Sequence, residues 1–154
     1  MLFTKRTETV GTHKGHVSFP GGRVDPGDDG PHDTALRELF EEVGVARERV
    51  RVLGLFHEAT AITGVAVTPV IASLGELDVD DLRLSTDEIA AAFTLSLAQL
   101  ADPLHRSQQA FGRLKAPRFT AGPHPVWGLT AWILDEVLRE AMGLDLPRLT
   151  AGDL

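Results

Sequence analysis

The most regular pattern of apolar and polar positions in this chain lies between Pro31 and Gly44. Its three- and four-residue spacing predicts a helix, with Pro31 in the first turn and Gly44 as a left-handed C-terminal cap. At about 100° per residue, apolar side chains share one arc and charged side chains share the opposite arc. The apolar arc holds Leu36, Leu39, Phe40 and Val43, and the charged arc holds Arg37, Glu38, Glu41 and Glu42. We expect the first arc to be buried and the second to be exposed.

Shorter apolar or alternating segments on both sides of this helix predict strands. The predicted strands are 1–6, 16–19, 51–56, 65–74 and 89–97, and two further helices are predicted at 98–104 and from about 126 to Gly143. The polar stretch 106–125 is expected to be a loop or linker. This order of elements is typical of a mixed α/β fold, with a sheet between helices.

Composition narrows the classes of protein to consider. With 154 residues, 43% of them hydrophobic, the chain is expected to form one domain over 1–146, followed by a tail at 147–154. A formal net charge of -7 argues against non-specific binding to nucleic acid. The absence of cysteine excludes disulfides and thiolate sites. No apolar run is long enough to span a membrane, so we expect a cytoplasmic protein by default.

The charged arc of the helix raises a physical question, because Glu38, Glu41 and Glu42 repel one another. A divalent cation such as Mg²⁺, which prefers oxygen ligands and often binds substrate phosphates as well, would offset this repulsion. The paired glycines Gly21 and Gly22 follow a predicted strand and permit close backbone approach, so that the Gly21 carbonyl can complete a metal site. The alternative is a solvated acidic face without a ligand.

The region from Gly22 to Val45 resembles the Nudix box. The second half, Arg37-Glu38-Leu39-Phe40-Glu41-Glu42-Val43-Gly44-Val45, matches that motif at every fixed position. In the first half, the interval from Gly22 to Arg37 is one residue longer than in the standard box, and the first glutamate is replaced by aspartate, at Asp28 or Asp29. The resemblance implies a Nudix-like α/β/α sandwich and metal-dependent hydrolysis of a pyrophosphate bond. It also implies that the family's sheet begins upstream of Met1, which leaves open a missing first strand and a homodimer that covers the exposed edge.

A second block, before the box, resembles the coenzyme A pyrophosphatase subgroup of this family. Its matching positions are Leu2, Thr4, Thr7, Gly15, Phe19, Pro20, Gly21 and Gly22, whereas an arginine of the subgroup is replaced by Gly11. The resemblance implies a nucleotide substrate, coenzyme A or a derivative, cut to 3′,5′-ADP and 4′-phosphopantetheine. Candidate substrate-binding residues are Lys14, Gly15, Phe19 and Gly22.

The resemblance also implies roles for the charged side chains of the helix. Glu38, Glu41 and Glu42, with the carbonyl of Gly21, are the expected ligands of Mg²⁺ or Mn²⁺. Glu41 is the preferred base that accepts a proton from water, and Arg37 is expected to orient a carboxylate. Two alternatives stay open: a Nudix pyrophosphatase for ADP-ribose or another nucleoside diphosphate, and a catalytically silent Nudix-like binding domain.

Overall fold

The computed structural model of the protein describes residues 1–9, 13–112 and 114–146. Internal contacts divide the chain into two compact units, Leu2–Phe93 and Met1 together with Thr94–Leu154. One domain over 1–146 stays a prediction, and the tail at 147–154 lies outside the described residues. No helix in the described part of the chain has both the length and the hydrophobicity needed to cross a bilayer.

The described residues of the first unit form short strands, one long helix and two 3₁₀ turns. Its elements are β1 (Leu2–Arg6), β2 (Val17–Ser18), α1 (Pro31–Val43), η1 (Arg47–Arg49), β3 (Arg51–Leu55), β4 (Ala59–Thr60), β5 (Ala66–Val67), β6 (Val70–Ser73), η2 (Val79–Asp81) and β7 (Ile89–Thr94, whose last residue belongs to the second unit). The strands form a three-stranded sheet in the order β2-β1-β7 and the pairs β3-β6 and β4-β5. The pairs β1-β2, β3-β6 and β4-β5 are antiparallel.

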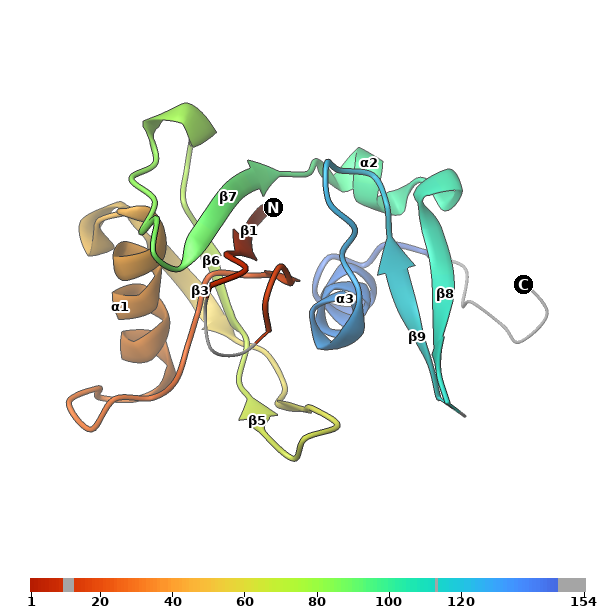
Figure 1. Cartoon of the computed structure of the whole chain (residues 1–154), viewed down its shortest axis with the longest axis horizontal. Coiled ribbons are helices and arrows are strands. Elements are labelled where there is room, and N and C mark those ends of the chain that lie inside the picture. The colour runs from red at the N-terminus through yellow and green to blue at the C-terminus, as the bar shows by residue number, and fades with distance from the viewer. Residues whose placement is uncertain (10–12, 113, 147–154) are drawn as a thin grey trace. The chain divides into compact units, whose positions relative to one another are not determined.

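Helix α1 has the bounds that the sequence pattern predicts, and it lies beside β6 (Figure 1). Gly44 ends the helix in the left-handed conformation, with φ 73°, and its N–H donates to the carbonyl of Phe40. A Cβ at Gly44 would lie 2.8 Å from the Cβ of Arg83, so the position requires glycine for its backbone and for its space. This cap turns the chain directly into the core at Val45, which is buried.

Part of the apolar face of α1 packs in a hydrophobic cluster of this unit. Leu39, Val43 and Val45 are its buried members. Partly buried side chains pack around them: Leu2, Val50, Leu74, Leu77, Leu82 and Leu84. The prediction was wrong for Phe40, which is 59% exposed. It was also wrong for the exposure of Glu42, which is only 2% exposed. Tertiary contacts beside Glu42, from Gly21 and Arg6, shift the buried arc toward the acidic side of the helix.

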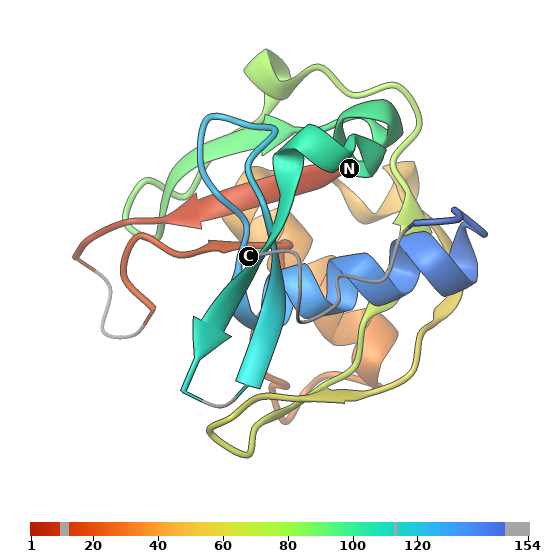
Figure 2. The same ribbon diagram turned by 90° about the vertical axis from the view of Figure 1, so that its right-hand side faces the viewer.

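The second unit contains a hairpin and a C-terminal helix. Its elements are α2 (Leu97–Ala101), η3 (Pro103–His105), β8 (Arg106–Phe111), β9 (Leu114–Phe119), α3 (Gly128–Glu136) and a π-helical turn, η4 (Val137–Ala141). Helix α3 contacts β9, as Figure 2 shows. Arg106 on β8 pairs with Asp135 on α3 at 2.6 Å, which ties the hairpin to the helix.

The structure corrects three predictions, one for a loop and two for strands. The stretch 106–125 contains the antiparallel hairpin β8-β9, whose mostly polar strands, poor in β-branched residues, gave no strand signal. The predicted strand 89–97 ends at Thr94, because Ser96 forms a capping box with Gln99 and starts α2. The predicted strand 65–74 is divided into β5 and β6 around Pro69, which has no N–H to donate to a ladder.

Candidate active site

A tight turn at the N-terminal side of α1 places Asp28 against Arg37. The N–H of Asp28 donates to the carbonyl of Asp25 at 2.9 Å, and the Asp25 N–H donates to the Asp28 carboxylate at 2.8 Å. The same carboxylate accepts a hydrogen bond from the hydroxyl of Thr34 at 2.7 Å. Of the two candidates for the first acidic residue of the box, Asp28 is therefore the one that the fold directs toward the helix.

Arg37 links Asp28 to the acidic face of α1. Its Nε and Nη2 donate to the two oxygens of Asp28 at 2.9 and 3.0 Å, and its Nη1 donates to Glu38 at 3.0 Å and to Glu41 at 3.1 Å. Nη2 also donates to the carbonyl of Arg23 at 2.9 Å. Hydrogen bonding with Arg37 lowers the pKa of Asp28 well below its usual range, so the anchor is ionised at neutral pH. Two carboxylates of the predicted metal set are thus held by one guanidinium.

Glu42 lies in a different environment from its two neighbours. Its carboxylate accepts a hydrogen bond from the Gly21 N–H at 3.3 Å, and its other oxygen lies 3.8 Å from Nη1 of Arg6. Desolvation by burial raises the pKa of Glu42 to about 7, against the lowering effect of the Gly21 N–H. A carboxyl with so high a pKa is only partly ionised near neutral pH, and a nearby cation would favour its charged form.

Gly22 is the point at which the backbone comes closest to the acidic helix. A Cβ built at Gly22 would lie 2.2 Å from an oxygen of Glu38, far inside van der Waals contact. Any larger residue would push the Glu38 carboxylate out of its position beside Arg37. Gly22 therefore leaves the space that the Glu38 carboxylate occupies, and the Gly21 N–H donates a hydrogen bond to Glu42.

The sequence analysis missed Arg6, the last residue of β1. Its Nη2 lies 3.8 Å from an oxygen of Glu88, while Nη1 faces Glu42 at the same distance. The N–H of Thr7 donates to the Glu88 carbonyl at 2.8 Å, which aligns the end of β1 with the segment before β7. The only sequence signal for Arg6 was its place at the end of a strand that begins with Leu2 and Phe3, and such a signal is weak.

The donor set of this site suits a hard divalent cation. The ion pairs join two guanidinium groups, Arg6 and Arg37, to the carboxylates of Asp28, Glu38, Glu41, Glu42 and Glu88. Negative charge is therefore in excess, and all the side-chain acceptors are oxygens. Within the described ranges, the oxygens of Glu38, Glu41 and Glu42 do not all lie within 4.8 Å of one another, because two of them face Arg37 and the third faces Gly21 and Arg6.

The predicted substrate-binding residues lie outside this carboxylate network, except for Gly22. Phe19 stacks on Phe3, with ring centroids 5.1 Å apart. Gly15 lies against the carboxylate of Glu8, and Lys14 is exposed on the same loop. Their contact with substrate stays a prediction, and Gly11 lies outside the described residues.

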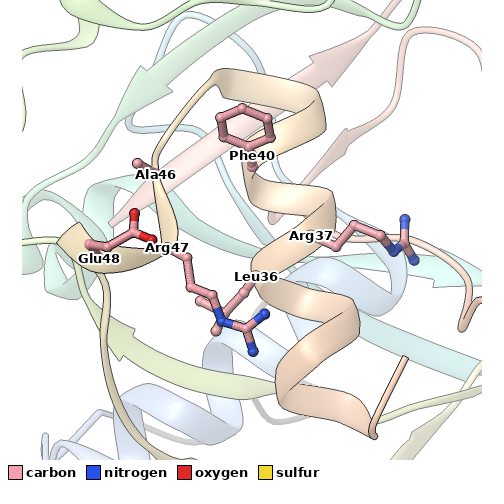
Figure 3. A pocket seen from close by; sticks show the side chains of 6 residues that line it. All are labelled: Leu36, Arg37, Phe40, Ala46, Arg47 and Glu48. Atoms are coloured by element: carbon pink, nitrogen blue, oxygen red, sulfur yellow. The ribbon is translucent and has the colours of Figure 1, made fainter. Parts of the chain in front are cut away.

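An open pocket of about 270 Å³ lies beside α1. Figure 3 shows that its lining side chains come from α1 and from the segment that follows the helix. They are Leu36, Arg37, Phe40, Ala46, Arg47 and Glu48. Phe40 thus borders a surface pocket in place of the core position that the sequence pattern predicted.

A glycine pair, then a helix on which one arginine holds two glutamates, is the arrangement that the Nudix box describes. The family model described as NUDIX domain matches residues 1–114. The chain therefore belongs to the Nudix family.

Its similarity to individual members extends over most of its length. It is 40% identical to the human mitochondrial coenzyme A diphosphatase NUDT8 over 156 residues, which cover 97% of the chain and 66% of that protein. It is 38% identical to the mouse protein of the same name, covering all of the chain and 77% of the relative. It is also 35% identical to the uncharacterized Nudix hydrolase NudL of Escherichia coli strain K12, covering 89% of the chain and 72% of the relative.

Solved structures agree on the fold. An Ap4A hydrolase binary complex from C. elegans matches with a TM-score of 0.51 at 24% identity, covering 63% of this chain and 68% of that one. The MutT protein from Methanosarcina mazei Go1 matches with a TM-score of 0.50 at 24% identity, covering 64% and 68%. The mixed α/β fold expected from the sequence is thus the fold of Nudix proteins.

Proposed function

We propose that this chain hydrolyses the pyrophosphate bond of coenzyme A or its derivatives, giving 3′,5′-ADP and 4′-phosphopantetheine. The observation that carries this proposal is the network in which Arg37, anchored on Asp28, holds Glu38 and Glu41 beside the buried Glu42. Similarity to two proteins named coenzyme A diphosphatase supports the substrate. The chain spans 66% of the length of the human relative, so the activity of the whole relative belongs to this proposal.

Glu38, Glu41, Glu42 and the carbonyl of Gly21 are the proposed ligands of Mg²⁺ or Mn²⁺. Such an ion supplies charge neutralisation and Lewis acidity to the diphosphate. Arg37 keeps Glu38 and Glu41 oriented. Glu41, whose side chain is exposed, is the proposed base. Its carboxylate accepts the proton of a water molecule whose oxygen bonds to phosphorus while the bridging P–O bond breaks, and the bridging oxygen leaves on the second phosphate.

The substrate is proposed to be a small nucleotide, with no role for nucleic acid, as the net charge of -7 suggests. A homodimer and a cytoplasmic location are parts of the same proposal, although the human and mouse relatives are named mitochondrial. Light scattering of the purified chain tests the dimer directly. A mass of about 17 kDa in solution would exclude it.

A substrate panel tests the activity. The purified chain is incubated with coenzyme A, acyl-coenzyme A, ADP-ribose and dinucleotides, each with Mg²⁺ or Mn²⁺, and products are separated by chromatography. Glu38→Gln and Glu42→Gln are matched controls for trace contaminants. Cleavage of ADP-ribose or dinucleotides with coenzyme A untouched would favour the alternative pyrophosphatase. No turnover of any member, with metal binding retained, would favour a silent binding domain.

A further inference from the structure

Thr34, in the first turn of α1, has a buried hydroxyl with two acceptors within reach. The hydroxyl lies 2.7 Å from an oxygen of Asp28 and 3.3 Å from the carbonyl of Gly30, and the residue is only 6% exposed. A hydroxyl has one hydrogen to donate, and a carboxylate at the shorter distance is the stronger acceptor. Thr34 therefore donates to Asp28, although the helix carbonyl of Gly30 would satisfy the same donor.

The contact with Thr34 completes the set of donors around the Asp28 carboxylate. The same carboxylate oxygen also accepts hydrogen bonds from the Asp25 N–H at 2.8 Å and from Nη2 of Arg37 at 3.0 Å. The Asp28 side chain is only 3% exposed, so protein donors rather than water hold it in place. Asp25 belongs to the same turn as Asp28, whereas Thr34 lies on the helix that carries Arg37. The hydroxyl is thus a second direct link between this carboxylate and α1.

We propose that Thr34 is a positioning residue, which acts through Asp28 and Arg37 on the carboxylates of the proposed metal site. This inference rests on the proposed function, because Arg37 donates to Glu38 and Glu41, two of the proposed ligands. A side chain that orients metal ligands typically contributes about 10- to 100-fold to metal affinity or activity. The alternative is that Thr34 only fills space in the first turn and satisfies its own hydroxyl.

Substitutions at this one position separate the two roles. Thr34→Val keeps nearly the same shape and removes the donor, Thr34→Ser keeps the donor and removes a methyl group, and Thr34→Ala removes both. Asp28→Asn, alone and combined with Thr34→Val, tests whether the effect passes through Asp28, because substitutions in one hydrogen-bond network are not additive. The readouts are kcat and KM for coenzyme A with Mg²⁺, and calorimetric binding of Mn²⁺ without substrate.

Thr34→Val is expected to lower kcat and to weaken Mn²⁺ binding about tenfold each, with KM little changed, while Thr34→Ser stays close to the wild type. In the Asp28→Asn background, Thr34→Val should have little further effect. Equal losses in Thr34→Ser and Thr34→Val would overturn the role of the hydroxyl. Additive losses in the double variant would overturn the path through Asp28, and with it the proposal.

Metal binding without substrate separates this inference from the proposed function. If the wild type binds Mn²⁺ but leaves coenzyme A intact, the proposed substrate fails, and weaker Mn²⁺ binding by Thr34→Val still supports the role of Thr34. If coenzyme A is cleaved and Thr34→Val matches the wild type in both readouts, the role of Thr34 is overturned. A wild type that binds no Mn²⁺ overturns both proposals. Should Thr34→Val not fold, Thr34→Ala compared with Thr34→Ser decides in its place.

Discussion

Asp28 and Arg37 form a two-pronged ion pair, with Nε and Nη2 of the arginine 2.9 and 3.0 Å from the two carboxylate oxygens. The remaining nitrogen of the same guanidinium donates to Glu38 and Glu41. Asp28 does not itself lie on the acidic face, but it determines where Arg37 points. The orientation of two proposed metal ligands therefore depends on a side chain in the preceding turn.

Asp28→Asn is expected to lower kcat about 10- to 100-fold, which is the usual effect of removing a group that orients a ligand. Asp29→Asn is the matched control and should leave kcat close to the wild-type value. Steady-state kinetics on coenzyme A measure both. Equal losses in the two variants would contradict the assignment of Asp28 as the anchor.

The lowered pKa of Asp28 predicts how the stability of the folded protein changes in acid. Hydrogen bonding lowers its pKa in the folded protein, so its contribution to stability is present above the usual carboxyl pKa of about 4 and is lost as the pH falls below that value. In Asp28→Asn, the fall in stability below pH 4 should be shallower than in the wild type. Urea unfolding at a series of pH values measures this dependence of stability on pH. An unchanged slope would show that Asp28 does not carry this dependence.

Glu42→Gln should separate stability from activity. The usual pKa of Glu42 is 4.5, and burial raises it to about 7 in the folded protein. The metal-free protein should therefore lose stability as the pH rises from 4.5 to 7, because in this range unfolding releases the proton that the carboxyl still holds in the folded state. At pH 8 with EDTA, the variant is expected to be more stable than the wild type by on the order of 1 to 3 kcal/mol. At pH 4.5 the two should be alike.

The activity of Glu42→Gln should be almost abolished, because the variant lacks a charged ligand. Thermal unfolding with and without Mg²⁺ adds a second readout. Mg²⁺ should stabilise the wild type and have little effect on the variant. Full activity in the variant would contradict the assignment of Glu42 as a metal ligand.

Gly22→Ala tests the close approach to Glu38. The added Cβ would lie 2.2 Å from a carboxylate oxygen, so Glu38 must move away from Arg37. A shift of about 1 Å at a reacting centre typically costs about a hundredfold in rate. Gly27→Ala is the control, because its nearest neighbour would be a side-chain oxygen of Asp25 at an ordinary 3.5 Å. Comparable kcat/KM for the two variants would show that Glu38 adapts freely.

The faces of α1 are tested by two neighbouring positions. Leu39 belongs to the buried cluster, so Leu39→Ala should lower the free energy of unfolding by about 2 to 5 kcal/mol. Phe40 is largely exposed, so Phe40→Ala should change the free energy of unfolding by about 0.5 kcal/mol or less. Urea denaturation measures both variants. A large loss at Phe40 would mean that its ring is covered in solution.

The bounds of α1 could be predicted because its signals are local. Proline, a left-handed glycine and helical spacing need no knowledge of the rest of the chain. The exposure of Phe40 and the burial of Glu42 could not be read from the same spacing, because packing of Gly21 and Arg6 from other segments decides them. The hairpin β8-β9 was missed for a related reason, since its polar strands are stabilised by cross-strand pairing.

The candidate site, like the fold, could be predicted from the sequence only in part. The motif was enough to group Arg37, Glu38, Glu41 and Glu42 and to identify the family, which the family comparison confirms. It could not choose between Asp28 and Asp29, because that choice depends on the path of a turn. Arg6 was missed because only the folded chain brings the end of β1 to Glu42 and Glu88.

The segment from Asp28 to Arg37 has a consequence for how such chains are found. Gly22 and Asp28 keep the spacing of the standard box, so the additional residue lies between Asp28 and Arg37, where an acid one methylene shorter than glutamate still reaches the arginine. Loop length and side-chain length can thus compensate for each other. A search pattern with rigid spacing would overlook this chain, whereas one that asks only for an acid within reach of the guanidinium would retrieve it.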